Sequence, residues 1–204
     1  MRAFIRDTAI AAPLAGINID TDQIIPARFM KRDRDDGYGQ HLFHDHRFGP
    51  DGAPRPDFVL NQPAFAGARM LVAGRNFGCG SSRESAVYAL VDYGIRAVLA
   101  PGFGDIFYSN ALKNGLIPVA LAEDVVNELR DKLLAGPARQ VTVDLEAKTV
   151  TLPGGESYPL LIDAFWRECI LKGVDEIEMT QGHLDQIEAF ERRYEQDHPW
   201  VVVR

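Results

Sequence analysis

The sequence predicts an α/β fold in which helices cover a partly parallel sheet. Between residues 65 and 121, short apolar runs alternate with segments of helical periodicity, which is the pattern of parallel strands joined by crossover helices. After residue 139, two β-rich runs separated by a short turn indicate a hairpin. A chain of 204 residues can bury a sizeable core. We therefore expect residues 1–204 to form a single domain with a helical tail at about 182–204.

The first sixty residues show no regular pattern, so we expect irregular structure at 4–60. The stretch 31–39 mixes charges of both signs with two glycines, which predicts a mobile surface loop. In the run 41–46, HLFHDH, His44 and His46 could reach one metal ion only from a strand or a turn, and the sequence shows no ordered third ligand. A solvated loop without a metal is the favoured interpretation here.

The middle of the chain carries the alternating pattern. Ala86, Val87 and Leu90 follow helical spacing, and Gly94 is a typical helix stop. Gly115 closes the next helical segment in the same way. We expect strand, helix, strand, helix and strand in that order, at 68–74, 81–93, 95–100, 105–114 and 116–121.

The last third mixes helices with the hairpin. We expect a helix at 122–135, hairpin strands at 140–145 and 149–152, a turn at 153–155, and helices at 163–172 and 182–196. The helix at 182–196 is charged almost all round, so it should lie on the surface or against a partner. It is the segment that we expect at a subunit interface.

Charge and the distribution of apolar residues disfavour several classes of function. The chain is acidic, with a net charge of −7, which disfavours nucleic-acid binding and means that local cations must hold any anionic substrate. The N-terminus has no signal-peptide-like apolar stretch, and no run of about eighteen apolar residues suggests a membrane span. We expect a cytoplasmic protein.

The two cysteines, Cys79 and Cys169, cannot form a disulfide framework or a CxxC site. Cys169 lies in a helical run and is expected to be a small buried residue. A [4Fe–4S] cluster takes about three or four thiolates, so two cysteines cannot ligate one. We expect no metal site or cofactor in this chain, and any cluster must come from another chain.

The segment 74–84, GRNFGCGSSRE, carries the most specific chemistry. Ser81 and Glu84 have capping-box spacing, which predicts Ser81 as the N-cap of the following helix. A helix N-terminus after glycines is a natural site for a carboxylate or a phosphate, and Arg83 could grip a carboxylate bidentately. A serine there becomes a base only if its alkoxide is stabilised by N–H donors and a cation. An ordinary capped helix with incidental serines is the plain alternative.

Two further segments join this one in a family resemblance. The motifs are NIDTDQIIPARF at 18–29, GRNFGCGSSRESA at 74–86 and PGFGDIFYSNALKNGLIP at 101–118. Together they resemble the swivelling β/β/α domain of the aconitase superfamily, and the resemblance covers nearly the whole chain. The chain length and the long loop at 28–57 favour the isopropylmalate isomerase branch, in which this domain is a separate small subunit.

The resemblance implies a hydro-lyase that works only with a large subunit, and the [4Fe–4S] cluster is expected in that partner. The implied reaction of leucine biosynthesis converts 2-isopropylmalate to 3-isopropylmalate through isopropylmaleate. Ser81, as an alkoxide, would take and return the carbon-bound proton. Ser82 and Arg83 would stabilise that site and hold a substrate carboxylate. Asp22 would orient a group of the partner across the interface.

Arg28 and Asn76 are further candidates for the substrate site or the interface. Substrate choice is expected in residues 28–40, where Phe29 and Met30 either face an isopropyl group or pack in the core. A related hydro-lyase of the homoaconitase, citramalate or dimethylmalate type would carry the same motifs. An RNA-binding module and a hydrolase that pairs Ser81 with a distant histidine are alternatives from other classes.

Overall fold

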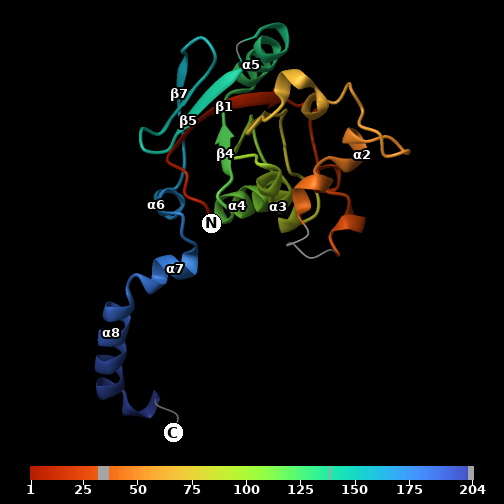
Figure 1. Cartoon of the computed structure of the whole chain (residues 1–204). Helices are drawn as coiled ribbons and strands as arrows, with labels where there is room; N and C mark the ends of the chain where they lie inside the picture. Colours follow the sequence, from red (N-terminus) through yellow and green to blue (C-terminus); the bar gives the residue numbers. More distant parts are fainter. Residues whose placement is uncertain (32–36, 138, 202–204) are drawn as a thin grey trace.

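The computed structural model describes residues 1–31, 37–137 and 139–201, and a seven-stranded mixed sheet forms its centre (Figure 1). The strands lie in the order β4-β3-β2-β1-β5-β6-β7, with β1 to β4 parallel and β5 to β7 antiparallel. Their bounds are Arg6–Pro13, Met70–Val72, Ala97–Ala100, Ile117–Ala120, Gln140–Asp144, Thr149–Thr151 and Ser157–Pro159 for β1 to β7. The predicted α/β class with a partly parallel sheet is confirmed.

The prediction of irregular structure at 4–60 is wrong for β1, the middle strand of the sheet. β1 pairs with β2 in parallel at Ala11–Pro13 and with β5 antiparallel at Arg6–Ile10. Its buried positions are small residues, with Ala9 at 4% exposure and Ala11 at 0%. The sequence pattern missed this strand because strand prediction relies on bulky β-branched and aromatic residues.

Helices cover both faces of the parallel half. α3 (Glu84–Tyr93) and α4 (Asp105–Lys113) pack on one face, and α5 (Glu123–Ala135) packs on the other. Strand side chains alternate between these layers: Leu71 belongs to the α3 core, and its neighbours Met70 and Val72 belong to the α5 core. The expected elements between 68 and 135 are confirmed with shifted ends.

The first core also receives the segment before β2. Two short helices, α1 (Thr21–Ile24) and α2 (His44–Arg47), lie in this segment, and Ile24, Leu42 and Phe43 are buried. The charged loop predicted at 31–39 falls largely on 32–36, which lie outside the described residues.

The antiparallel half continues into α6 (Ala164–Lys172). The predicted hairpin is confirmed as β5 and β6, and a turn with Gly154 and Gly155 leads to β7. Cys169 on α6 is fully buried, as expected, and burial raises the pKa of its thiol.

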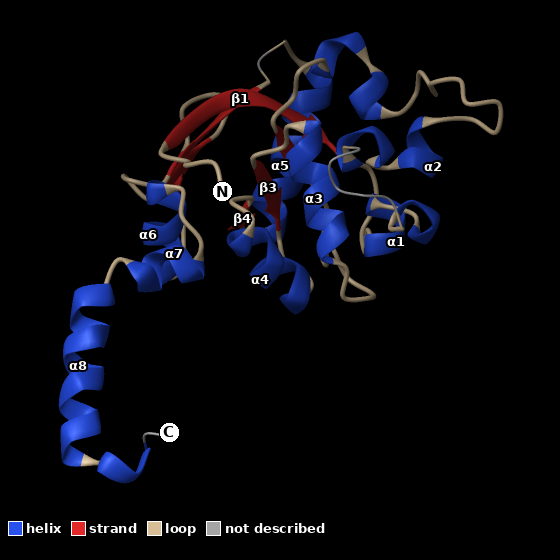
Figure 2. Cartoon of the chain, turned by 60° about the horizontal axis from the view of Figure 1, so that its bottom comes forward, coloured by secondary structure: helices blue, strands red, loops and turns tan. Residues whose placement is uncertain are grey.

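The C-terminus forms two helices, α7 (Glu176–Gln181) and α8 (Leu184–Asp197), and α8 lies apart from the sheet (Figures 1 and 2). Every residue of α8 except Ile187 is exposed, so the expected surface position is confirmed. Within the ranges described, no helix has both the length and the apolar character to cross a membrane.

Candidate active site

Three loops at the carboxyl ends of β1, β2 and β3 meet and hold one another through backbone hydrogen bonds. The Gly78 amide donates to the Ile19 carbonyl at 2.7 Å, and the Thr21 amide donates to the Cys79 carbonyl at 3.0 Å. The Phe77 amide donates to the Gly102 carbonyl at 3.1 Å. The three sequence motifs are therefore brought together at the edge of a parallel sheet where α/β folds commonly bind ligands.

Two glycines make this meeting possible. Gly78 has φ +72°, and a Cβ built there would lie 2.2 Å from Cγ of Phe107. A Cβ on Gly104 would lie 2.6 Å from the Gly78 carbonyl oxygen. Only glycine allows these backbones to approach so closely.

The loops enclose an open hollow of about 230 Å³. Its lining residues are Thr21, Gly78, Cys79, Gly80, Ser81, Ser82, Arg83, Gly104, Asp105, Ile106 and Phe107. The three predicted catalytic residues thus lie together in one concave site. The sequence predicts no role for Thr21 or Asp105, although both belong to the motifs given above.

The prediction that Ser81 caps the helix is wrong. α3 begins at Glu84 with Arg83 in the N-cap position, and no side chain caps it. The Thr21 hydroxyl donates to the Ser81 carbonyl at 2.8 Å, and the Glu84 carboxylate accepts from the Asn114 amide at 2.9 Å. These tertiary contacts keep the chain extended through Arg83 and leave the capping box unformed.

As a result, the Ser81 hydroxyl does not take part in holding the helix start. It makes no hydrogen bond to the described part of the chain, and Ser81 and Ser82 are both exposed. A hydroxyl in this position can contact a bound molecule without breaking a structural interaction.

Arg83 is paired with Asp22. The guanidinium Nη1 of Arg83 donates to Oδ1 of Asp22, and the Arg83 side chain is only 14% exposed, whereas the Asp22 side chain is 57% exposed. A guanidinium carries five N–H donors, so this contact leaves donors for a second carboxylate. Asp22 fixes the orientation of the Arg83 guanidinium, a contact that the sequence motifs did not predict.

Asn76 and Arg28 do not line the hollow. Nδ2 of Asn76 donates to Oδ1 of Asn18 at 2.9 Å, and both residues have positive φ. The Arg28 guanidinium holds Asp45 with Nη1···Oδ2 at 2.9 Å and lowers the pKa of that carboxyl to about 2. Asn76 therefore ties two of the loops together, and Arg28 lies in a separate hollow with His44 and Arg55.

The residues of this chain do not fit a resident iron–sulfur cluster or a histidine-assisted serine. Cys79 lines the hollow, but Cys169 is buried on α6, and about three or four thiolates are needed. Within the described residues, no three His, Cys, Asp or Glu side chains gather to hold a metal. No histidine lines the hollow, so the pair that a Ser81 hydrolase needs is not formed there.

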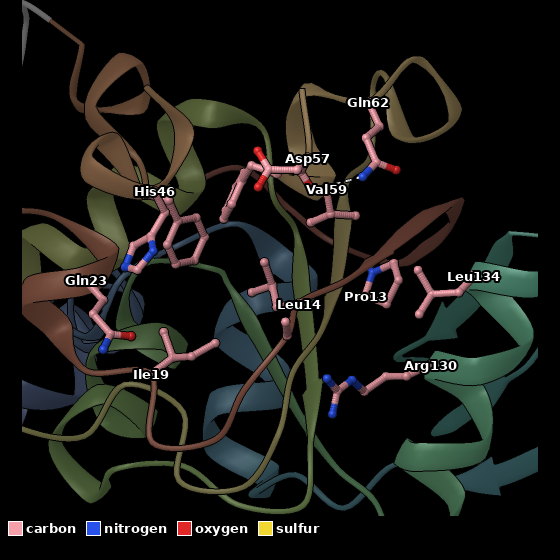
Figure 3. Close-up of a pocket in the computed structure, with 13 residues that line it drawn as sticks. Pro13, Leu14, Ile19, Gln23, His46, Asp57, Val59, Gln62, Arg130 and Leu134 are labelled. Carbon is pink, nitrogen blue, oxygen red and sulfur yellow. Dashed lines mark hydrogen bonds between the residues drawn. The ribbon is translucent and has the colours of Figure 1, made fainter. Parts of the chain in front are cut away.

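A second hollow of about 320 Å³ lies between the segment after β1, residues 43–62 and α5 (Figure 3). Apolar side chains of Leu14, Ile19 and Val59 line it from different sides, and Arg130 extends toward it from α5. Gln23 lines it, but none of the serines does. This hollow therefore lacks the combination of hydroxyls and cation that the first one has.

Two protein-family models match this chain, and one of them includes the candidate site. Residues 1–124 match the family model of the aconitase C-terminal domain, and residues 127–164 match the model described as LeuD_N. The first match contains all three loops of the candidate site.

Curated relatives match the chain from end to end. The 3-isopropylmalate dehydratase small subunit of Rhodospirillum centenum is 50% identical over 99% of this chain and 100% of its own length. The protein of the same name from Paracoccus denitrificans is 47% identical over 98% of this chain and 100% of its own length.

A solved structure shares the fold. The crystal structure of 3-isopropylmalate dehydratase from Methanocaldococcus jannaschii has a TM-score of 0.62 and 27% identity, and it covers 91% of this chain and 99% of that one. The expected aconitase-type fold is confirmed. By its family matches and its full-length relatives, this chain belongs to the family of 3-isopropylmalate dehydratase small subunits, within the aconitase superfamily.

Proposed function

We propose that this chain is the small subunit of an isopropylmalate isomerase of leucine biosynthesis. The enzyme converts 2-isopropylmalate to 3-isopropylmalate by dehydration to isopropylmaleate and rehydration. The observation that carries this proposal is the single hollow that holds Ser81, Ser82 and Arg83 where three loops meet. The names of the full-length relatives support the substrate.

The site suits a dicarboxylate. The whole chain is acidic, so a substrate dianion needs concentrated local positive potential. Arg83 supplies it with a planar fork that can bind a carboxylate bidentately, and Asp22 holds that fork in place. Backbone N–H groups at the start of α3 add to the positive end of the site.

Ser81 is proposed as the group that moves the proton on carbon. Its hydroxyl makes no hydrogen bond with the described residues and lies beside Arg83 in the hollow. The cation and nearby N–H donors would stabilise the alkoxide form that accepts the proton, and the same oxygen would return it during rehydration. Ser82 would stabilise that alkoxide and help to hold the carboxylate.

The partner is proposed to be a large subunit that carries a [4Fe–4S] cluster. The thiols of this chain do not fit such a cluster, which agrees with a division of the site between two chains. Both cysteines are free, as is usual for proteins of the reducing cytoplasm, where we place the enzyme. Residues 1–204 would act as one domain with the C-terminal tail.

The proposal is tested by anaerobic assay of 2-isopropylmalate isomerisation, with this chain alone and then with a cluster-bearing large subunit. Activity is expected only in the mixture, and the chain alone should be colourless. A panel of citramalate, dimethylmalate and homocitrate-type substrates tests the related hydro-lyases. An intact, cluster-loaded complex that turns over one of these and not isopropylmalate would move the assignment to that substrate.

Arg83→Lys is expected to raise the KM for isopropylmalate by about tenfold or more, because a point charge cannot replace a bidentate fork that Asp22 also orients. The measurement is steady-state kinetics of the assembled enzyme. Arg75→Lys is the matched control, since Arg75 is exposed in the same loop and does not line the hollow. An unchanged KM in Arg83→Lys would remove Arg83 from the carboxylate site.

A further inference from the structure

Within the C-terminal arm, residues 174–201, α8 stands away from the body of the domain, whereas α7 contacts it through an ion pair of Glu176 with Lys113 on α4. Figures 1 and 2 show α8 separated from the sheet and connected to it only through α6 and α7. A capping box between Asp175 and Glu178 starts α7, and Arg192 pairs with Glu188 on α8. Local interactions of this kind support a helix weakly, and an isolated helix of 14 residues is marginal in water.

One side of α8 is apolar. Leu184, Ile187, Phe190 and Tyr194 follow spacings of three and four residues, which places them on one side of a helix. Leu184 is 51% exposed, Phe190 52% and Tyr194 41%. We call these four residues the arm stripe. The expectation that this helix is charged almost all round is therefore wrong on one side, because the many charged residues outnumber the four residues of the stripe.

Aromatic rings extend the stripe beyond the helix. Phe190 stacks on Tyr194 with centroids 5.5 Å apart, and Tyr194 stacks on His198 at 4.4 Å. His198 meets Trp200 edge to face at 5.2 Å, and Trp200 is 76% exposed. Trp and Tyr are among the side chains that most often dominate the binding energy of protein interfaces.

The flanks of the arm are acidic. Residues 174–201 contain eight carboxylates and two arginines, namely Asp175, Glu176, Glu178, Asp185, Glu188, Glu191, Glu195 and Asp197 with Arg192 and Arg193. A surface that binds this arm must therefore be apolar along its floor and basic along its edges, since like charges would oppose docking.

Two observations identify the partner that provides such a surface. The relatives named as small subunits match 98–99% of this chain and 100% of their own length, so the arm belongs to the length that they share. In both overall views α8 extends beyond α6 and α7, clear of the helices that cover the sheet. An arm that small subunits share and that stands clear of its own domain is open to the subunit with which they assemble.

We propose that the arm stripe docks on the large subunit, in a groove with an apolar floor and Lys or Arg at its edges. This inference rests on the proposed function, because it takes the large subunit as the partner. The arm holds the two chains together from a position outside the catalytic hollow, and it contributes affinity without contacting the substrate.

The test compares two double variants of the full chain. Ile187→Gln with Phe190→Gln alters the stripe, and Ala189→Gln with Gln196→Asn makes two uncharged substitutions on the opposite side of the same helix. The Kd for purified large subunit is measured by calorimetry. The stripe variant is expected to bind at least about tenfold more weakly, with the control within about twofold of wild type.

Two further readouts separate this inference from the proposed function. Thermal unfolding of the stripe variant alone should match that of wild type, since the stripe does not pack on the domain. At saturating large subunit, its isomerisation rate should return to the wild-type value.

Equal Kd values for the stripe variant and wild type would overturn the docking proposal, whatever the activity. A wild-type chain that self-associates through the stripe, with unchanged affinity of the variant for the large subunit, would also overturn it in favour of a second copy. Absence of isomerisation by a fully formed wild-type complex would instead reject the proposed function and leave the docking result standing.

Discussion

Replacing Ser81 with alanine is expected to lower the isomerisation rate of the assembled enzyme by about a hundredfold to ten-thousandfold. The expectation follows from the place of the hydroxyl, which lies in the hollow beside Arg83 and makes no hydrogen bond to the described residues. The interaction that fixes Ser81 uses its backbone carbonyl, which accepts from the Thr21 hydroxyl at 2.8 Å. Alanine keeps that carbonyl, so folding and assembly should remain intact.

The measurement is kcat under anaerobic conditions with saturating large subunit and substrate. Affinity for the large subunit and the urea midpoint of the isolated chain are measured in parallel and should not change. Ser157→Ala is the matched control, because Ser157 is an exposed serine on β7, outside the hollow. A Ser81→Ala enzyme with a near-normal rate would reject Ser81 as the group that moves the proton.

Gly78→Ala is expected to destabilise the isolated chain by about 2–6 kcal/mol, the sum of a strained backbone and an overpacked contact. Gly78 has φ +72°, and its added Cβ would lie 2.2 Å from Cγ and 2.7 Å from Cβ of Phe107. Phe107 is 3% exposed and packs against Phe77 and Phe103, so it has little room to move. The strain falls on the point where the loops of the site meet.

Urea unfolding of the isolated chain measures this effect. Gly102→Ala provides the control, since a Cβ there would meet nothing within 4 Å and the glycine does not need a positive φ. It should shift the midpoint little. An unchanged midpoint in Gly78→Ala would mean that the close packing of this loop against α4 is absent from the folded chain.

The sequence predicted the elements whose signals are local. Strand and helix alternation between 68 and 121 appears in the structure because apolar periodicity and glycine stops act over a few residues. β1 escaped prediction because its buried positions are alanines, and its strand conformation depends on β2 and β5, which lie far along the chain. Burial between two neighbours can override weak local propensity.

The candidate site could be predicted only in part, for a similar reason. The three motifs were recognised, and the structure brings Ser81, Ser82 and Arg83 into one hollow. The prediction that Ser81 caps the helix was wrong because the hydroxyl of Thr21, sixty residues earlier, donates a hydrogen bond to the Ser81 carbonyl. The pairing of Asp22 with Arg83 is likewise a tertiary contact that sequence spacing does not encode.

The central place of β1 has a consequence for how the protein is made. β1 leaves the ribosome first, yet one of its edges pairs with β5, which begins at Gln140. At about 5–20 residues per second, that edge waits on the order of ten seconds for its partner. An unpaired strand edge can join other chains during this time. Newly made chains should therefore depend on chaperones until residues 140–144 have emerged.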